Sequence, residues 1–241
     1  MNYLDLFKFD SDIFYKEYDK EERERGVLIH NDCIKVMNKL EDSCVNFTLT
    51  DIPYDSVNRK SNGLRELNKG NADILTFDLE KFLEEVYRVT SGTIVIFCGM
   101  NQVSPIFNYF DVLAKKGKGT VRQLIWKKTN PSPMNGEYIY LSGLENAIWF
   151  KKKGATFNAH CKSNVFEFPC GRSKLHPTEK NHNLIKDLIV DNSNENDILF
   201  DPCSGSASHL FCARELNRRF LGCELDDNYF QVGVNRLKGE H

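Results

Sequence analysis

Asp51, Ile52, Pro53 and Tyr54 form the stretch of the chain that is best suited to chemistry. They follow residues 45–50, an apolar run that predicts a buried strand, and they precede a long polar segment. In an open α/β sheet, the loop that leaves the carboxyl end of a strand faces the ligand crevice. A carboxylate, a rigid backbone carbonyl and an aromatic ring at that point suit a planar substrate that bears an amino group. The alternative is an ordinary proline-anchored turn with Tyr54 in the core.

A second stretch is suited to binding a cofactor. Residues 197–200 predict a strand, which leads into a turn of small residues at 201–207 and then into a helix. Such a turn lets the backbone approach a ligand closely. Glu224 ends the next predicted strand, about 20 residues later, where a carboxylate can accept both hydroxyls of a ribose. Gly205 is the one glycine in the turn, so the sequence excludes the dinucleotide fingerprint and favours a nucleoside without a pyrophosphate.

The elements that must position these two stretches follow from the apolar periodicity. Residues 93–97 form a β-branched apolar run, which is typical of a strand buried on both faces. Residues 77–90 carry apolar side chains at helical spacing. Strand and helix patterns of these two kinds alternate along most of the chain. This alternation predicts an α/β fold, doubly wound, with a mostly parallel sheet.

The chain divides into a lead-in and one domain. Residues 1–25 predict a helical segment that packs in cis or in trans, so a homodimer stays open. Residues 26–241 are enough for a single domain with a good core. The alternation ceases at 127–175, where we expect an insertion that recognises the target. A plain surface excursion fits the composition of this segment nearly as well.

Composition and charge exclude several classes of protein. No apolar run approaches the roughly 20 residues of a membrane span, and we expect a cytoplasmic protein without a membrane partner. The 8 cysteines contain no Cys-x-x-Cys pair, so we expect reduced thiols and no metal site. The net charge is −2, yet Lys and Arg gather at 59–69, 115–128 and 151–174. Basic runs in predicted loops around one site favour an anionic partner.

Taken in order, the motifs resemble those of the β-class DNA amino-methyltransferases. The resemblance covers nearly everything from residue 26 to residue 237. It rests on an ordered set of six motifs, which lie at residues 31–33, 50–54, 126–133, 176–180, 201–207 and 222–226. The family transfers a methyl group from S-adenosylmethionine to an exocyclic amine of a base in double-stranded DNA.

The resemblance implies a role for each matching residue. Asp51 and the carbonyl of Ile52 or Pro53 would accept the two hydrogens of the target amine, and Tyr54 would stack on the flipped-out base. The implied cofactor is S-adenosylmethionine, and the residues that would bind it are Asp32, Cys33, His176, Thr178, Lys180, Asp201, Cys203, Gly205, Ser206, Ala207 and Glu224. Among these, Asp32 and Cys33 would contact the adenine, Glu224 the ribose, and 176–180 the methionine end.

The residue at position 51 bears on which base is methylated. Aspartate rather than serine favours adenine N6 over cytosine N4. Cytosine N4 methylation, adenine methylation of RNA and a non-catalytic relative that binds nucleic acid stay open as alternatives. Three departures from the family pattern favour the non-catalytic relative. Ile52 replaces a proline, Cys203 replaces an aromatic residue and Ala207 replaces a glycine.

Overall fold

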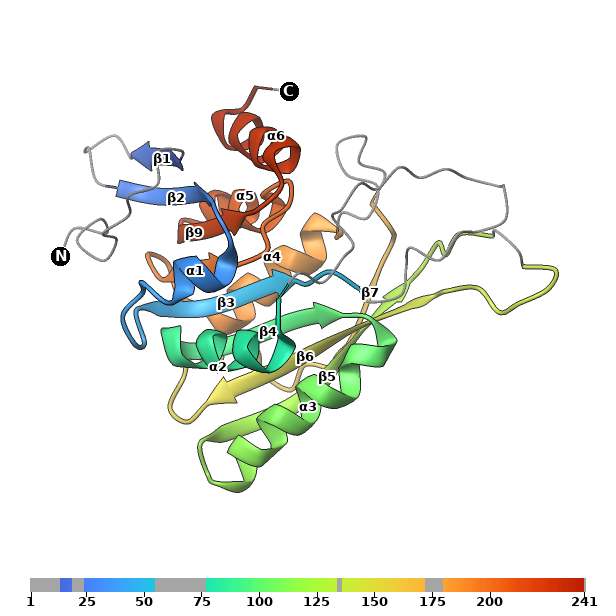
Figure 1. Cartoon of the computed structure of the whole chain (residues 1–241). Coiled ribbons are helices and arrows are strands. Elements are labelled where there is room, and N and C mark those ends of the chain that lie inside the picture. The colour runs from blue at the N-terminus through green and yellow to red at the C-terminus, as the bar shows by residue number, and fades with distance from the viewer. Residues whose placement is uncertain (1–13, 19–23, 55–76, 134–135, 172–179, 241) are drawn as a thin grey trace.

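The computed structural model describes residues 14–18, 24–54, 77–133, 136–171 and 180–240. A nine-stranded sheet in the order β1-β2-β9-β8-β3-β4-β6-β5-β7 runs through the described part of the chain (Figure 1). Its strands are β1 (Phe14–Tyr18), β2 (Glu24–His30), β3 (Val45–Asp51), β4 (Thr90–Cys98), β5 (Gly119–Lys128), β6 (Leu144–Lys152), β7 (Val165–Phe168), β8 (Ile198–Asp201) and β9 (Arg219–Glu224). The helices are α1 (Cys33–Met37), α2 (Leu79–Val89), α3 (Met100–Lys115), α4 (His182–Asn192), α5 (Ser208–Glu215) and α6 (Asp227–Lys238).

Helices cover both faces of this sheet (Figure 1). Successive side chains of a strand point to opposite faces, so each buried strand contributes to two apolar cores. Ile94 and Ile96 of β4 lie in the core that also contains side chains of α1, α2 and α3. Val95 and Phe97 lie in the core that contains side chains of α4, α5 and α6. The predicted doubly wound α/β fold is therefore confirmed.

The sheet is mixed, and the direction of β6 matters for the site. Parallel pairings join β2 to β9, β9 to β8, β8 to β3 and β3 to β4. The next strand, β6, runs antiparallel to both β4 and β5, with Asn146 opposite Cys98. The start of β6 therefore lies beside the carboxyl ends of β3 and β4, where the sequence places Asp51.

One prediction about local structure is wrong. Within the lead-in, which we expected to be helical, residues 14–18 form a strand that pairs antiparallel with β2. This strand provides backbone partners for the outer edge of β2, which helix formation could not do; residues 1–13 and 19–23 lie outside the described residues. Within 127–175, residues 165–168 pair with β5 and extend the sheet.

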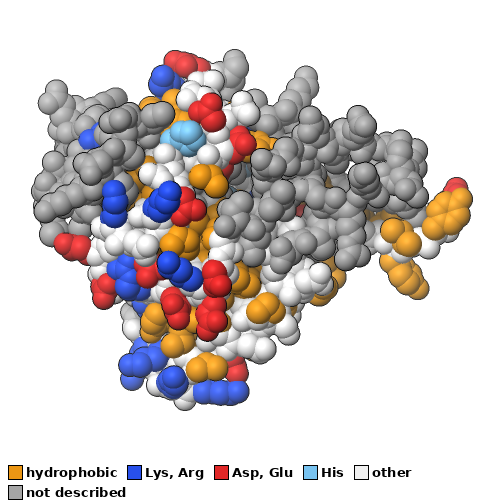
Figure 2. Space-filling model, in the orientation of Figure 1, with side chains coloured by type: hydrophobic (Ala, Val, Ile, Leu, Met, Phe, Trp, Pro, Cys, Tyr) orange, Lys and Arg blue, Asp and Glu red, His pale blue; other side chains and the backbone are white. Residues whose placement is uncertain are grey.

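The expectation that three basic runs surround one site holds only in part. The run at 59–69 lies outside the described residues, and Lys128, at the end of the run 115–128, pairs with Glu145 near Asp51. Lys151 of β6 lies opposite Thr93 near the start of β4, whereas Asp51 lies opposite Phe97 near its end. The N–H of Lys153 donates to the carbonyl of Lys118, so the start of the run 115–128 and residues 151–153 meet at the far end of the sheet from Asp51. Figure 2 shows Lys and Arg side chains gathered at that end of the molecule. The basic residues are divided between the two ends of the sheet because β5 and β6 each cross it from one end to the other.

All 8 cysteines lie in the described ranges and are free thiols, as predicted. Four of them are buried, and Cys161 is exposed. Among the described helices, none has the length and apolar content that crossing a membrane requires.

Candidate active site

The loop that follows β3 is held by hydrogen bonds to the neighbouring elements. Ile52 is buried, and its N–H donates to a carbonyl of β4 at 3.2 Å. The side-chain amide of Gln102, from α3, donates to the carbonyl of Pro53 at 2.9 Å, and its oxygen accepts the N–H of Gly99 at 2.8 Å. The residue after Asp51 is therefore fixed even though it is not a proline.

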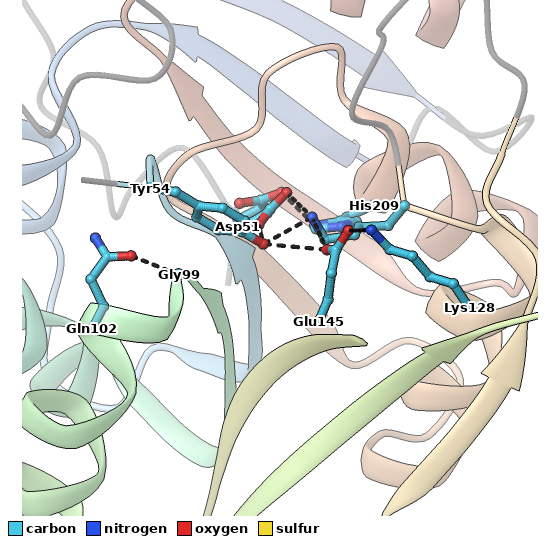
Figure 3. Close-up of polar contacts among 9 residues, drawn as sticks. Asp51, Tyr54, Gly99, Gln102, Lys128, Glu145 and His209 are labelled. Carbon is cyan, nitrogen blue, oxygen red and sulfur yellow. Dashed lines mark hydrogen bonds and ion pairs between the residues drawn. The ribbon is translucent and has the colours of Figure 1, made fainter. Parts of the chain in front are cut away.

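Asp51 belongs to a network of ionic groups that come from four segments of the chain (Figure 3). The Lys180 ammonium nitrogen lies 2.5 Å from Asp51 Oδ2 and 3.0 Å from Glu145 Oε2. The Tyr54 hydroxyl donates to Asp51 Oδ1 at 2.9 Å and accepts a hydrogen bond from Lys180 at 3.1 Å. Lys128 forms an ion pair with Glu145 Oε1 at 2.8 Å. We call these five residues the catalytic corner, and their two carboxylates and two ammonium groups balance in charge.

Burial and charge set the protonation states in this corner. Burial raises the pKa of Tyr54 well above its usual value, and the negative charge of Asp51 adds to the rise. Burial favours the neutral form of Lys180, but Asp51, Tyr54 and Glu145 outweigh it and raise the pKa of Lys180. Burial likewise works against the charge of Glu145, yet Lys180 and Lys128 hold the pKa of Glu145 below its usual value. At neutral pH, Tyr54 is therefore neutral, Lys180 protonated and Glu145 ionised.

The turn after β8 is organised around a buried carboxylate. Asp201 is 1% exposed, and its Oδ2 lies 2.8 Å from Nδ1 of His209, which is also buried. Its Oδ1 accepts the N–H of Cys203 at 3.1 Å. Since His209 belongs to α5, these two bonds tie the end of β8, the turn and the following helix together.

Two residues of this turn have left-handed backbone conformations. Gly205 has a φ of 50° and Ala207 a φ of 57°. Glycine adopts this conformation freely, whereas alanine does so at a cost of roughly 1–2 kcal/mol. The Ala207 methyl group is fully buried, and Ser206 beside it is 4% exposed. The backbone therefore reverses sharply at 205–207 before α5 begins, as we expected of a turn that a ligand approaches closely.

Glu224 reaches from the end of β9 to the same turn. Its Oε2 accepts the N–H of Gly205 at 2.7 Å, and its Oε1 accepts the N–H of Asp226 at 2.8 Å. Burial raises the pKa of Glu224, although these backbone N–H groups oppose the rise. Each carboxylate oxygen has a further lone pair, so the oriented carboxylate can still accept two hydroxyl hydrogens. We call residues 201–207 together with Glu224 the cofactor turn.

Asp32 and Cys33 lie against the cofactor turn. Asp32 caps α1 by accepting a backbone N–H of its first turn at 3.0 Å. The neighbouring Asn31 N–H donates to the carbonyl of Glu224 at 3.0 Å, because β2 and β9 are adjacent parallel strands. The thiols of Cys33 and Cys203 form a hydrogen bond, which raises the pKa of Cys203 together with burial. The residues expected to contact adenine and ribose are thus side by side.

The structure therefore gathers the expected residues at the carboxyl ends of β2, β3, β8 and β9. His176 and Thr178 lie outside the described residues. Lys180, which we expected at the methionine end of a cofactor, contacts Asp51 and Tyr54. Which atoms of a cofactor each residue touches stays a prediction.

Sequence reasoning missed Glu145, Gln102 and His209. Glu145 stands near the start of an apolar strand, but its place beside Asp51 depends on β6 running antiparallel to β4, which periodicity does not reveal. Gln102 stands three residues after Gly99, a spacing typical of a capping box, and this signal could have identified it. His209 gives no local signal of its pairing with Asp201.

The model of the N6_N4_Mtase family, described as DNA methylase, matches residues 45–235. The chain belongs to this DNA methylase family. The methylase is 29% identical over 236 residues to the Type II methyltransferase M.HpaI of Haemophilus parainfluenzae. This match covers 88% of the methylase and 74% of the length of M.HpaI.

Solved structures agree with this assignment. The crystal structure of an M1.HpyAVI–SAM complex is 27% identical with a TM-score of 0.65, and the match covers 87% of the methylase and 98% of that chain. The PvuII DNA methyltransferase, which is cytosine-N4-specific, shares the fold with a TM-score of 0.66 at 16% identity, and the match covers 88% and 86% of the two chains. The resemblance that the sequence motifs indicated is confirmed.

The methylase acts on DNA and uses S-adenosylmethionine as its cofactor. The residues present fit this cofactor. Glu224 offers an oriented carboxylate for a ribose, and the backbone of 205–207 reverses beside it. Asp32, Asp201 and Glu224 supply acidic groups around this position, which suits a ligand whose sulfonium is positively charged.

Proposed function

We propose that the methylase transfers the methyl group of S-adenosylmethionine to the N6 amine of adenine in double-stranded DNA. The observation that carries this proposal is the position of Asp51. Its carboxylate ends β3 at the same edge of the sheet as the cofactor turn, and it is fixed by Lys180 and Tyr54. An aspartate at this position favours adenine over cytosine.

The residues around Asp51 support direct transfer to an amine. An exocyclic amine on a base is a poor nucleophile because its lone pair is delocalised into the ring. Two fixed acceptors, Asp51 and the carbonyl of Ile52 or Pro53, would bind its hydrogens and orient the lone pair. The carbonyl of Pro53 already accepts a bond from Gln102, which favours Ile52 as the second acceptor. When bound, S-adenosylmethionine supplies an electrophilic methyl group on its sulfonium.

The charge of Asp51 has a second use. As the methyl group is transferred, positive charge develops on the amine nitrogen, and a preorganised carboxylate stabilises that charge. Because the transfer is direct, none of the 8 cysteines needs to serve as a nucleophile. The target base would leave the duplex to reach this position, and Tyr54 would replace stacking worth about 1–3 kcal/mol.

Product analysis tests this proposal. The purified methylase is incubated with labelled S-adenosylmethionine and mixed-sequence duplex DNA that lacks both modifications, and the DNA is digested to nucleosides for mass identification. We expect N6-methyladenine with the wild-type chain and its formation to be about 100- to 1,000-fold slower with Asp51→Ala. Cofactor binding without any product would point to a recognition sequence absent from this DNA or to RNA as the substrate, and no cofactor binding either would favour the non-catalytic relative.

Cytosine N4 methylation is the second candidate. It is favoured by the shared fold with the cytosine-N4-specific PvuII enzyme. The same digestion separates the two, because N4-methylcytosine as the product would replace the adenine assignment.

Binding to duplex DNA is tested by its dependence on salt. Lys127 is exposed at the end of β5 nearest Asp51, and Lys153 is exposed at the opposite end of the sheet. If the DNA lies over the active site, Lys127→Ala should reduce the slope of log Kd against log salt by about 0.9, and Lys153→Ala should leave it unchanged. Equal effects of the two variants would contradict this placement.

A further inference from the structure

Both oxygens of the Asp51 carboxylate already have partners. Oδ2 is bound by the Lys180 ammonium group, and Oδ1 accepts the hydroxyl of Tyr54. Each oxygen keeps a further lone pair, so a target amine that binds Asp51 either shares an oxygen with its present partner or displaces that partner. Displacement of Lys180 is the costlier of these events. The Lys180 side chain is 3% exposed, so water cannot replace a lost partner. A buried ammonium group without a carboxylate is strongly unfavourable.

Glu145 provides the carboxylate that Lys180 needs. It lies near the start of β6, and its Oε2 is 3.0 Å from Lys180. Its other oxygen, Oε1, is held by Lys128 from the neighbouring strand β5. Because Lys128 fixes Glu145 independently, Glu145 can retain Lys180 whether or not Lys180 also binds Asp51.

We propose that Glu145 is a positioning residue for methyl transfer, which holds the Lys180 ammonium group when the target amine displaces it from Asp51. This inference rests on the proposed function. With a neutral side chain at position 145, Lys180 would have Asp51 as its one remaining carboxylate among those that contact it in the described structure. The target amine would then compete with a complete buried ion pair for the same oxygen.

Glu145→Gln tests the proposal because it keeps the shape of the side chain and removes its charge. We expect kcat/KM for DNA to fall about 10- to 100-fold, since hydrogen bonds to charged groups are worth roughly 1.5–3 kcal/mol. The Kd for S-adenosylmethionine should stay within about twofold, as expected for independent sites.

Glu85→Gln is the matched control. Glu85 is 17% exposed against 19% for Glu145, and it pairs with Arg88 at 2.6 Å on α2. This variant measures the general effect of losing a half-buried ion pair. We expect it to lower Tm and to leave kcat/KM unchanged.

Two further variants separate positioning from a merely structural role. In a Lys180→Met background, Glu145→Gln should cause no additional loss beyond about twofold, because position 180 no longer carries an ammonium group for Glu145 to hold. Glu145→Asp, which restores the charge one methylene shorter, should recover part of the activity that Gln loses. Since Glu145→Asp does not depend on Lys180→Met, the rescue can be measured even if the lysine variant fails to fold.

The outcomes distinguish the two proposals. A wild-type chain that methylates no DNA overturns the proposed function and this inference with it. An active wild-type chain together with unchanged kcat/KM in Glu145→Gln overturns the inference alone. Losses from Glu145→Gln and Lys180→Met that simply add, or a Glu145→Asp variant no better than Gln, also overturn it.

Discussion

The catalytic corner and the cofactor turn lie at the same edge of one sheet but are held by different forces. The catalytic corner is held by ion pairs among side chains from β3, β5, β6 and the segment before α4. The cofactor turn is held by backbone N–H groups that bind Asp201 and Glu224. In the first region a single lost charge leaves another buried charge unpaired, whereas in the second most of the donors belong to the backbone and survive mutation.

The difference implies that charge substitutions should affect chemistry and binding separately. Substitutions in the catalytic corner should change the rate of transfer and the pH dependence of stability. Substitutions in the cofactor turn should change affinity for S-adenosylmethionine, because its backbone donors persist and its fold is retained.

Asp51→Ala should have the largest effect. We expect kcat to fall about 100- to 1,000-fold, equivalent to roughly 2.7–4 kcal/mol, because a group that stabilises developing charge is lost. Steady-state methylation of DNA measures this change, and the rise in Tm on adding S-adenosylmethionine should be retained. Asp51→Asn keeps the shape of the side chain and removes its charge. A near-normal rate in that variant would show that the Asp51 charge does not contribute to the rate of methyl transfer.

Glu224→Gln should come next and should act on the other region. We expect the Kd for S-adenosylmethionine to rise about 10- to 100-fold, because a charged acceptor of hydrogen bonds is worth roughly 1.5–3 kcal/mol. At saturating cofactor, kcat should be close to that of the wild type. Calorimetry measures the Kd, and a normal Kd with a reduced kcat would contradict the division between the two regions.

The ion pairs of Glu145 should make stability depend on pH. Its folded-state pKa lies below the ordinary value of 4.5, so the stabilisation is complete above 4.5 and is lost as the pH falls through the lowered pKa. We expect Glu145→Gln to reduce the free energy of unfolding by about 1–3 kcal/mol at neutral pH. Urea unfolding of both proteins should show this difference shrinking below pH 4.5; a difference that does not vary with pH would argue against the ion pairs.

Ala207→Gly should have the smallest effect. Relief of the left-handed conformation favours glycine by roughly 1–2 kcal/mol. The loss of a buried methyl group and the greater freedom of glycine in the unfolded chain oppose this gain by about 0.8 and 0.4–1 kcal/mol. We therefore expect the free energy of unfolding to change by less than about 1 kcal/mol, as measured by urea unfolding. A loss above about 2 kcal/mol would mean that the methyl group is essential to packing against α6.

The local structure of the cofactor turn was predicted well because its parts are consecutive in the sequence. A strand, a turn of small residues and a helix start follow one another within 197–216, and Glu224 ends the next strand. Asp51 and Tyr54 were predicted for the same reason. Their partners were not, since Lys180 is 129 positions from Asp51 and Glu145 is 91 positions from Tyr54.

Some elements were missed although their local signals are present. Asp226 caps α6, and the apolar residues of α6 recur at helical spacing, yet that helix was not predicted. β1 and β7 are short strands at the two edges of the sheet, with few residues to establish a period. The antiparallel insertion of β6 between β4 and β5 depends on contacts across the sheet, which composition does not report.

The hairpin of β5 and β6 has a consequence for how the methylase can diversify. Its ladder continues from Gly119 opposite Lys152 to Lys127 opposite Leu144, and the N–H of Lys128 donates to the carbonyl of Gly143 at 2.8 Å. The segment between Lys128 and Gly143 therefore starts and ends at neighbouring positions on the sheet. A change in its length alters the entropy cost of closing this loop only slowly. Segments of other lengths and sequences can be exchanged there by recombination while the register that sets Lys128 beside Glu145 is inherited intact.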